Sequence, residues 1–246
     1  MKNNYSNIFT FNRKILSKTI NYLNNGNIVG LPTETVYGLG GNAYNKSSLK
    51  KIFKLKGRSK LNPLIIHYHS LNEALNDVKI NKNFLSLYSK FCPGIITFIL
   101  NKKSDSTIHS LASAKLKTIA IRFPKHAIIR SILKKINYPL AMPSANITSN
   151  VSPVRALDVY DEFKKKIKLI IDGGSSKIGI ESTVIDLTNN PKILRPGIID
   201  KKTIEKILKF KIKKYLKNKR GKSPGMMKKK YSHEIKVLIN KKKHNK

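Results

Sequence analysis

The chain has 246 residues, 40% of them hydrophobic, which is enough to bury one substantial core and is typical of one α/β domain. The chain contains no run of about 18 apolar residues that could cross a bilayer, and its first residues lack the apolar stretch of a signal peptide. We therefore expect a cytoplasmic protein without membrane contact. The single cysteine, Cys92, excludes an internal disulfide and a cysteine-based zinc site, and we interpret it as a buried filler.

The formal net charge of +37 comes from 50 lysine and arginine residues against 13 acidic ones. Clustered cations bind phosphates without regard to sequence, so this charge is compatible with a nucleic-acid partner. A chain rich in lysine, asparagine and isoleucine is also what an AT-rich genome encodes at unconstrained surface positions. The charge therefore supports affinity for polyanions but indicates no particular function.

Helix and strand signals alternate along the chain. Helical apolar spacing over 14–23 ends at Asn24-Asn25-Gly26, which is typical of a left-handed helix stop, and a strand follows at 28–31. Ser47 or Ser48 can cap a helix that runs through Leu55, and 63–67 has the pattern of a buried strand. Further strands are expected at 95–100, 118–122, 140–142, 169–172, 182–186 and 193–195, and further helices at 83–91, 126–135, 156–163 and 203–208. The alternation predicts an α/β fold with a twisted mixed sheet and flanking helices.

The composition changes after about Leu208. Residues 209–246 are rich in lysine, have little apolar periodicity and contain the turn signal Ser223-Pro224-Gly225-Met226. We therefore expect a folded domain over 1–208, followed by a basic, linker-like tail over 209–246 that is poorly ordered unless it docks on the domain.

The segment 31–41, LPTETVYGLGG, places hydroxyl groups, a carboxylate and a phenol beside glycines directly after a strand. Glycines allow the backbone to approach a ligand closely, and Thr33, Thr35 and Tyr37 can orient a small polar molecule. An ordinary strand-to-helix turn explains the same residues equally well.

Two cations and a histidine form a second candidate cluster. Lys56 and Arg58 flank a glycine and suit a triphosphate, because lysine acts as a point charge and arginine as a planar fork. The chain has no Walker A pattern, which excludes a P-loop nucleotide site. His67, beside an apolar run, is more often a core histidine than a ligand contact, and the other histidines show no metal-ligand spacing.

Short polar side chains follow several predicted strands. Thr118 and Arg122 share one strand, and the segment 142–146, MPSAN, continues to Ser152. Such donors are what a sheet offers a nucleotide at its carboxyl edge, although turn formation also explains them. Two further segments are GIESTVID at 179–186 and LRPG at 194–197. Taken alone, each is explained equally well as a strand with polar neighbours.

Taken together, six segments resemble the YrdC-like threonylcarbamoyladenylate synthases in order and spacing: PTETVYGLG, KGRSKLNPLIIH, TIAIRFP, PSAN, GIESTVID and LRPG. The resemblance covers about residues 14–208 and implies that this part is the catalytic domain. The chain departs from the family pattern at Ser59 and at Ser149-Asn150, where we expect Asn150 to hold the left-handed turn usually made by glycine.

The tail resembles the linker of the longer, two-domain branch of that family. This likeness rests on 223–226, SPGM, followed by Tyr231, although Lys230 stands where the linker histidine would be. The resemblance therefore implies a two-domain synthase that has kept the linker and lost the second domain.

The resemblance implies an enzyme that joins L-threonine, bicarbonate and ATP into threonylcarbamoyl-AMP and releases pyrophosphate. It assigns Lys56 and Arg58 as catalytic residues that hold the phosphates with Mg²⁺, without a metal site made by the protein alone. The implied ATP site contains Arg58, Asn62, Thr118, Ser144, Ser152, Arg195 and Tyr231. The implied L-threonine site contains Thr33, His67, Arg122, Met142 through its backbone, and Ser182. Arg122 is expected to pair with the carboxylate of the amino acid.

The product is expected to feed a separate threonylcarbamoyl transferase complex that modifies adenosine 37 of tRNA. Two other interpretations remain open. The basic composition favours a non-catalytic module that binds double-stranded RNA or tRNA. Related domains in hydrogenase-maturation proteins transfer a carbamoyl group from carbamoyl phosphate, but those proteins carry zinc-finger cysteines that Cys92 alone cannot supply.

Overall fold

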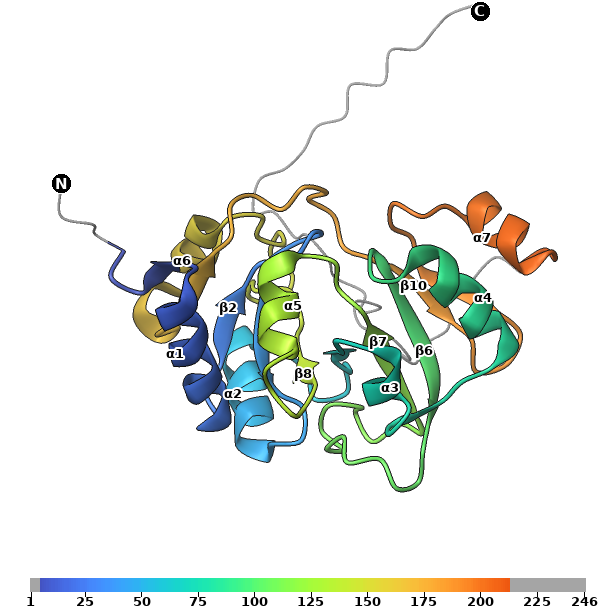
Figure 1. Ribbon diagram of the computed structural model, residues 1–246, viewed down its shortest axis with the longest axis horizontal. Helices are drawn as coiled ribbons and strands as arrows, with labels where there is room; N and C mark the ends of the chain where they lie inside the picture. Colours follow the sequence, from blue (N-terminus) through green and yellow to red (C-terminus); the bar gives the residue numbers. More distant parts are fainter. Residues whose placement is uncertain (1–4, 213–246) are drawn as a thin grey trace, which may run out of the picture.

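The computed structural model describes residues 5–212, which form one mixed sheet with helices packed on it (Figure 1). Tyr231 and the expected tail from residue 213 onward lie outside the described residues. The strands are β1 (Ile8–Thr10), β2 (Val29–Leu31), β3 (Gly38–Asn42), β4 (Ile65–His67), β5 (Val78–Lys79), β6 (Ile96–Lys102), β7 (Thr118–Arg122), β8 (Leu140–Ala141), β9 (Ile170–Asp172), β10 (Thr183–Asp186) and β11 (Lys192–Arg195). The helices are α1 (Arg13–Asn24), α2 (Lys46–Lys56), α3 (Leu71–Ala74), α4 (Lys82–Phe91), α5 (Ala127–Leu133), α6 (Ala156–Phe163), the 3-10 turn η1 (Lys164–Lys166) and α7 (Lys201–Leu208).

The sheet combines parallel and antiparallel neighbours. Its strand order is β1-β9-β2-β3-β8-β4-β7-β6-β10-β11, and β5 pairs with β6 beside this path. The parallel pairs are β1 with β9, β9 with β2, β4 with β7 and β6 with β10. The other pairs are antiparallel. The predicted α/β fold with a mixed sheet and flanking helices is confirmed.

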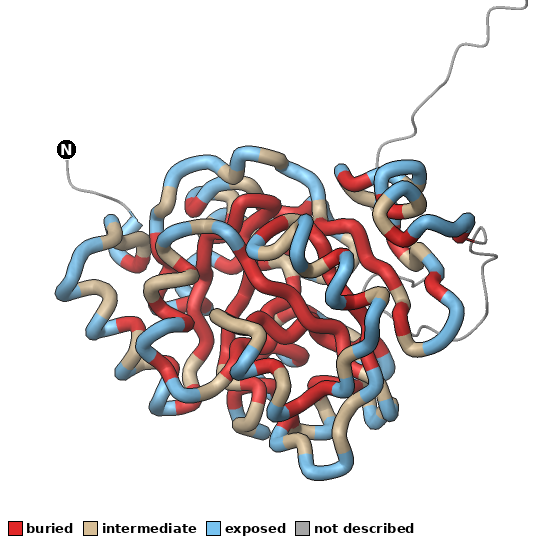
Figure 2. Tube along the Cα trace, turned by 45° about the vertical axis from the view of Figure 1, so that its right-hand side comes forward, coloured by how far each residue is buried: buried red, intermediate tan, exposed pale blue. Residues whose placement is uncertain are grey.

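Helices cover both faces of the sheet. Side chains alternate between the faces along each strand, so neighbouring residues of one strand contact different helices. In β9, Ile170 packs in the cluster that includes α2, α4, α6 and α7, whereas Ile171 packs in the cluster with α1 and α5. Buried segments accordingly run through the middle of the molecule (Figure 2). Helices α1, α2 and α6 lie toward one end and α3, α4 and α7 toward the other (Figure 1).

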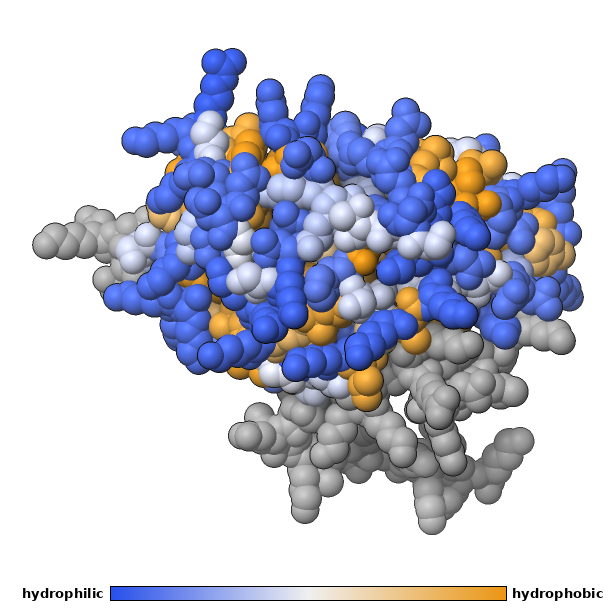
Figure 3. All heavy atoms as spheres, turned by 90° about the horizontal axis from the view of Figure 1, so that it is seen from below, coloured by the Kyte–Doolittle hydropathy of each residue, from blue (hydrophilic) through white to orange (hydrophobic). Residues whose placement is uncertain are grey.

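Hydrophilic side chains cover most of the face seen in Figure 3, with smaller apolar areas between them. Among residues 5–212, no helix is long and apolar enough to span a bilayer. The described residues extend to Ile212, a few positions past Leu208, and the boundary at Leu208 stays a prediction. Ile212 is 3% exposed, and its N–H donates to the Glu205 carboxylate of α7 at 2.6 Å.

Most predicted elements match the structure to within a few residues, and 118–122 and 156–163 match fully. The start of α2 needs correction, because its N-cap is Asn45 rather than Ser47 or Ser48. The Asn45 side chain accepts a hydrogen bond from the Ser48 N–H at 3.0 Å, which is the role that asparagine fills well at a helix start. Gly26, with φ of 67°, confirms the predicted left-handed stop after α1.

Strand β3 occupies much of the segment 31–41, for which a strand-to-helix turn was one of the two explanations left open. Its glycines make it a poor strand by propensity, and packing explains why they are there. A Cβ atom on Gly38 would lie 2.5 Å from Cγ of Met142, so the chain can pass this point only without a side chain.

The elements β1, β5 and α3 were missed because two to four residues are too few to show a periodicity.

Two smaller expectations also differ from the structure. The left-handed residue after the PSAN segment is Ser149, with φ of 84°, rather than Asn150. The Asn150 side-chain amide instead donates to the Glu162 carboxylate at 2.7 Å, which fixes this loop against α6. Cys92 is half-buried rather than fully buried, and its burial raises the pKa of the thiol to about 12.

Candidate active site

A cavity opens beside the turn that joins β2 to β3. Its empty space, including the part open to solvent, is about 520 Å³. The predicted site residues that line it are Thr33, Arg58, His67, Arg122, Met142, Ser144, Ser182 and Arg195. The structure therefore brings residues of the predicted ATP site and of the predicted L-threonine site to one place.

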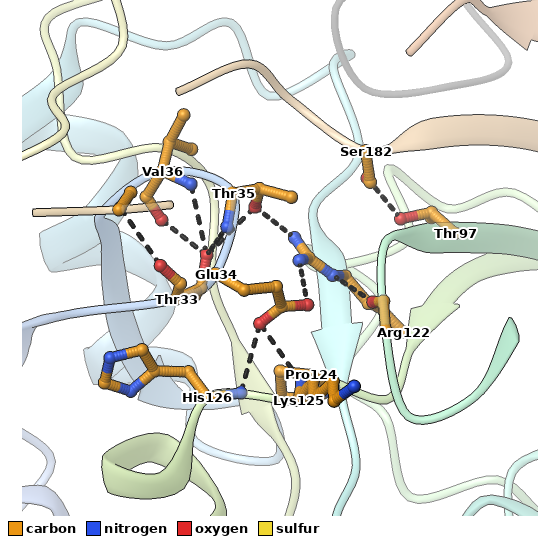
Figure 4. Close-up of polar contacts among 12 residues, drawn as sticks. Thr33, Glu34, Thr35, Val36, Thr97, Arg122, Pro124, Lys125, His126 and Ser182 are labelled. Atoms are coloured by element: carbon orange, nitrogen blue, oxygen red, sulfur yellow. Dashed lines mark hydrogen bonds and ion pairs between the residues drawn. The ribbon is translucent and has the colours of Figure 1, made fainter. Parts of the chain in front are cut away.

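Strand register explains why several of these residues meet. β4 and β7 are parallel with His67 beside Arg122, and β6 is antiparallel to β7 with Thr97 beside Arg122. Residues paired in register point to the same face of a sheet, so these three side chains form one row. Ser182 extends the row, because its hydroxyl lies 2.7 Å from that of Thr97 (Figure 4).

The Thr33 hydroxyl organises the turn between β2 and β3. It donates to the Val36 carbonyl at 2.6 Å and accepts from the N–H groups of Thr35 and Val36 at 3.1 and 3.2 Å. It also lies 2.9 Å from the Thr35 hydroxyl (Figure 4). Side chain-to-backbone bonds of this kind hold a tight turn in place of backbone pairing. Thr33 therefore shapes the wall of the cavity, with its oxygen already engaged by the turn.

Arg122 is held by three acceptors at the end of β7. Its guanidinium donates to the Glu34 carboxylate at 2.6 Å, to the Thr35 hydroxyl at 2.8 Å and to the Gly94 carbonyl at 3.2 Å. Figure 4 shows Glu34 reaching under the guanidinium from the β2–β3 turn. Arg122 and Glu34 are 4% and 8% exposed, so this ion pair is buried. Nothing in the sequence indicates that Arg122 has a carboxylate partner inside the protein.

His67 is buried beside Arg122 and lines the cavity. Burial, and then the nearby positive charge of Arg122, lower the pKa of His67 to about 3. The imidazole is therefore neutral at physiological pH, and its Nδ1 lies 3.2 Å from the Ile65 carbonyl oxygen. A neutral imidazole offers one donor and one acceptor, so His67 can contribute hydrogen bonds but no charge to the site.

Arg195, at the end of β11, connects two groups that precede β10. Its guanidinium pairs with the Glu181 carboxylate at 2.6 Å, and it donates to the Ser182 carbonyl and hydroxyl, both at 3.0 Å. Glu181 also accepts from the Ser152 hydroxyl at 3.3 Å. Arg195 thereby fixes Ser182 in the row of side chains at the sheet edge.

Arg58 lies beyond the C-terminus of α2, where Gly57 with φ of 57° turns the chain. It donates to Asn62 through both the backbone oxygen at 3.0 Å and Oδ1 at 2.6 Å, and to the Pro63 carbonyl at 2.7 Å. These acceptors are all neutral, and the carboxylate that acts on Arg58 electrostatically is Glu181, which is already paired with Arg195. Arg58 and Arg195 together therefore keep a net positive charge for a ligand in the cavity. Asn62 itself is buried and acts on Arg58 rather than lining the cavity.

Lys56 is 1% exposed and does not line the cavity. Its ammonium donates to the Ser144 carbonyl at 2.5 Å and to the Asn146 carbonyl, so it ties α2 to the PSAN segment. Burial, and then the charge of Arg58, lower the pKa of Lys56 to about 7. In this structure Lys56 positions the loop that carries Ser144, and its expected contact with phosphates remains a prediction.

Besides Lys56 and Asn62, two predicted site residues among those that the structure describes do not line the cavity. Thr118 begins β7 and pairs with Asn101, at the end of the strand opposite to Arg122. Ser152 is nearly buried and reaches the cavity only through Glu181. Tyr231 lies outside the described residues. Their roles in binding ATP remain predictions.

Glu34, Thr97 and Glu181 are not among the site residues predicted from the sequence, yet each contacts a predicted one. Glu34 and Glu181 stand within the recognised segments, but nothing in the sequence says which cation each of them faces. One available signal was the buried arginine itself, because a charge on a central strand requires a partner. Within residues 5–212, no group of three or more histidine, cysteine, aspartate or glutamate side chains could hold a metal ion.

Comparison with known proteins decides the family. The Sua5/YciO/YrdC family model, described as "Telomere recombination", matches residues 21–197. The chain belongs to the Sua5/YciO/YrdC family. This result confirms the resemblance that the ordered sequence segments indicate.

Relatives of this chain come from archaea, bacteria and eukaryotes. It is 39% identical over 224 residues to a threonylcarbamoyl-AMP synthase of Pyrococcus abyssi, an alignment that covers 89% of this chain and 65% of the relative. It is 39% identical over 217 residues to the threonylcarbamoyl-AMP synthase of Bacillus subtilis, covering 86% and 61%. The chain thus spans less than two thirds of the length of these relatives.

Among solved structures, P. abyssi Sua5 complexed with L-threonine superimposes with a TM-score of 0.86 at 36% identity. The match covers 92% of this chain and 68% of that one. The described fold is therefore that of the Sua5/YciO/YrdC family.

Proposed function

We propose that the chain synthesises L-threonylcarbamoyladenylate from L-threonine, bicarbonate and ATP and releases pyrophosphate. The observation that carries the proposal is one cavity with two kinds of arginine. Arg122 is balanced by a buried carboxylate, whereas Arg58 donates only to neutral oxygens. A cavity with both suits a substrate pair in which one member carries a carboxylate and the other a triphosphate. The relatives named threonylcarbamoyl-AMP synthase support the same pair.

The amino-acid end of the cavity is formed by residues on β4, β7 and the start of β10. Arg122 has five N–H donors, and its three hydrogen bonds to protein groups use only some of them. It can therefore still bind a carboxylate. His67 and Ser182 supply neutral polar groups beside it, while Thr33 and the Met142 backbone shape the wall. A relative solved with L-threonine supports this choice of amino acid.

The nucleotide end is formed around Arg58, Ser144 and Arg195. Arg58 offers charge to the phosphates, Asn62 orients it, and Lys56 holds the loop of Ser144 beside it. Thr118, Ser152 and Tyr231 complete the nucleotide site by resemblance. The Mg²⁺ ion would arrive with ATP, because this ion commonly binds substrate phosphates and one or two carboxylates. Glu181, which lines this end, is the carboxylate that fits that arrangement, and the ion would offset phosphate charge there.

The reaction makes modest chemical demands on the protein. The threonine amine captures carbon dioxide as a carbamate, whose oxygen attacks the α-phosphorus while pyrophosphate leaves. Such a transfer depends on positioning the reactants and on stabilising phosphate charge. The fixed row His67, Arg122 and Ser182, with Arg58 at the other end, provides both without a nucleophile from the protein.

The product, a mixed anhydride, would pass to a separate threonylcarbamoyl transferase complex that modifies adenosine 37 of tRNA. We place the chain in the cytoplasm, where ATP and tRNA are available. Tyr231 would close over the nucleotide from the linker.

The basic composition, with a net charge of +37, favours direct tRNA contact as a second candidate function.

Pyrophosphate release from ATP tests the proposal, with L-threonine and bicarbonate each left out in turn. We expect release only when both are present. Release with carbamoyl phosphate in place of bicarbonate and threonine would favour carbamoyl transfer instead. No release under any condition, together with tight binding of tRNA, would favour a non-catalytic RNA-binding module.

A further inference from the structure

Glu34 neutralises Arg122 from behind the wall of the cavity. Its carboxylate accepts from the Arg122 guanidinium at 2.6 Å and from the N–H groups of Lys125 and His126 at 3.1 and 3.2 Å (Figure 4). Arg122 and Thr35 line the cavity, whereas Glu34 is not among the lining residues. Glu34 therefore acts on a ligand only through Arg122.

The three lining arginines differ in how their charge is balanced. Arg122 pairs with Glu34 and Arg195 pairs with Glu181, each at 2.6 Å. The hydrogen bonds of Arg58 go to neutral oxygens of Asn62 and Pro63. The end of the cavity that holds Arg122 is thus closer to electrical neutrality than the end that holds Arg58.

The charge balance at each end of the cavity affects which anion binds there. A guanidinium without a counter-ion binds phosphate strongly through two parallel hydrogen bonds. A carboxylate held against the guanidinium offsets that charge and repels a second anion, and the repulsion grows with the charge of the newcomer. A carboxylate with one negative charge is therefore tolerated better at Arg122 than a phosphate dianion or a triphosphate.

We propose that Glu34 is a specificity-determining positioning residue, which holds and neutralises Arg122 so that phosphate groups are excluded from the amino-acid end of the cavity. The inference rests on the proposed function, because it assumes that an amino acid and a nucleotide share this cavity. It explains how two anionic substrates are kept apart within one cavity.

The test uses the full chain with three variants: Glu34→Gln, Glu34→Asp and Thr35→Val. Glu34→Gln removes the charge, Glu34→Asp keeps the charge with a shorter reach, and Thr35→Val removes an uncharged acceptor of the same guanidinium. The readouts are KM for L-threonine, KM for ATP and the pattern of inhibition by inorganic phosphate. Thermal unfolding identifies variants that are folded.

In the wild type, phosphate should compete with ATP and not with L-threonine. In Glu34→Gln it should also compete with L-threonine, with an inhibition constant against L-threonine lowered about tenfold or more, as expected for the gain of a charge-assisted hydrogen bond. Glu34→Asp and Thr35→Val should raise KM for L-threonine severalfold and still exclude phosphate.

Failures of the inference and of the proposed function give different results. If the wild type releases no pyrophosphate with L-threonine and bicarbonate, the proposed function is wrong and the inference falls with it. If the wild type is active and folded Glu34→Gln still excludes phosphate from the L-threonine site, only the inference is wrong. If Glu34→Gln does not fold, phosphate competing with L-threonine in Thr35→Val overturns the inference, because the charge there is unchanged.

Discussion

Asn62 holds Arg58 with two hydrogen bonds, one to its backbone oxygen at 3.0 Å and one to its side-chain oxygen at 2.6 Å. The two residues are four positions apart, on the loop between α2 and β4. This short connection aims the guanidinium into the cavity. It explains physically why an asparagine follows the arginine at this spacing in the sequence.

Arg58→Ala should abolish adenylate formation and leave the fold intact, because the half-buried guanidinium contacts only loop oxygens that water can reach once it is removed. The loss of a charge-assisted phosphate contact costs about 1.5–3 kcal/mol, and more if the contact tightens in the transition state. Pyrophosphate release measures the effect, and thermal unfolding confirms the fold. Turnover at the wild-type rate would exclude Arg58 from the site.

Asn62→Ala should weaken the same contact without removing the charge. We expect KM for ATP to rise about three- to tenfold, since one hydrogen bond that orients the guanidinium contributes about 0.5–1.5 kcal/mol to its positioning. Ser59→Ala is the matched control, because the Ser59 hydroxyl only accepts a bond from the Leu61 N–H in the same loop. Equal ATP kinetics in both variants would contradict the role given to Asn62.

Lys56 should make stability depend on pH. Its pKa is about 7 in the folded chain against 10.5 for an ordinary lysine, so between these values the unfolded chain binds more protons. The free energy of unfolding should therefore rise with pH through this window and level off above it. The destabilisation by Lys56 is fully present below about pH 7.

The measurement compares the wild type with Lys56→Met by urea unfolding at about pH 7 and about pH 9.5. The wild type should gain stability relative to the variant as the pH rises. Lys54→Met, which changes an exposed lysine of the same helix, should show no such pH-dependent difference. A constant difference between wild type and Lys56→Met would mean that Lys56 stays protonated throughout the window.

Serine should replace L-threonine poorly but measurably. The wall near Arg122 includes the apolar side chains of Val36, Ile65 and Met142, which can contact the extra methyl group. Burying one methyl contributes about 1 kcal/mol, so kcat/KM for serine should be about fivefold lower. Equal kcat/KM values for the two amino acids would argue against a cavity shaped for threonine.

The tail after Ile212 should matter for ATP. By resemblance Tyr231 closes over the nucleotide, and a closed site protects a labile anhydride from water. Truncation after Ile212, which keeps this buried residue, and Tyr231→Ala should each raise KM for ATP and increase hydrolysis of the intermediate. Unchanged ATP kinetics in both variants would show that the tail has no part in the reaction.

Most elements of the fold could be predicted from the sequence, because apolar periodicity follows burial directly. The strand 118–122 and the helix 156–163 are clear examples. Strand β3 was missed for a physical reason, since its glycines are set by close approach to Met142 and not by local propensity. The N-cap at Asn45 was missed because several candidate capping residues stand side by side there.

The site shows a similar division. Residues from distant segments, such as Arg58 and Arg195, were selected by resemblance, and the structure places both at one cavity. The ion pairs were not predictable, because Glu34 and Arg122 are 88 positions apart and meet only through the sheet topology. Whether an arginine is balanced by a carboxylate is a property of the fold, and that balance is central to the site.

Incorporation of carbon from bicarbonate into an adenylate tests the central claim most directly. The chain would be incubated with ATP, L-threonine and carbon-13 bicarbonate, and the nucleotide products analysed by mass spectrometry. We predict a threonylcarbamoyl-AMP product that is one mass unit heavier than with ordinary bicarbonate, and its loss in Arg58→Ala. An adenylate without the label, or no adenylate from the folded wild type with all three substrates, would contradict the account.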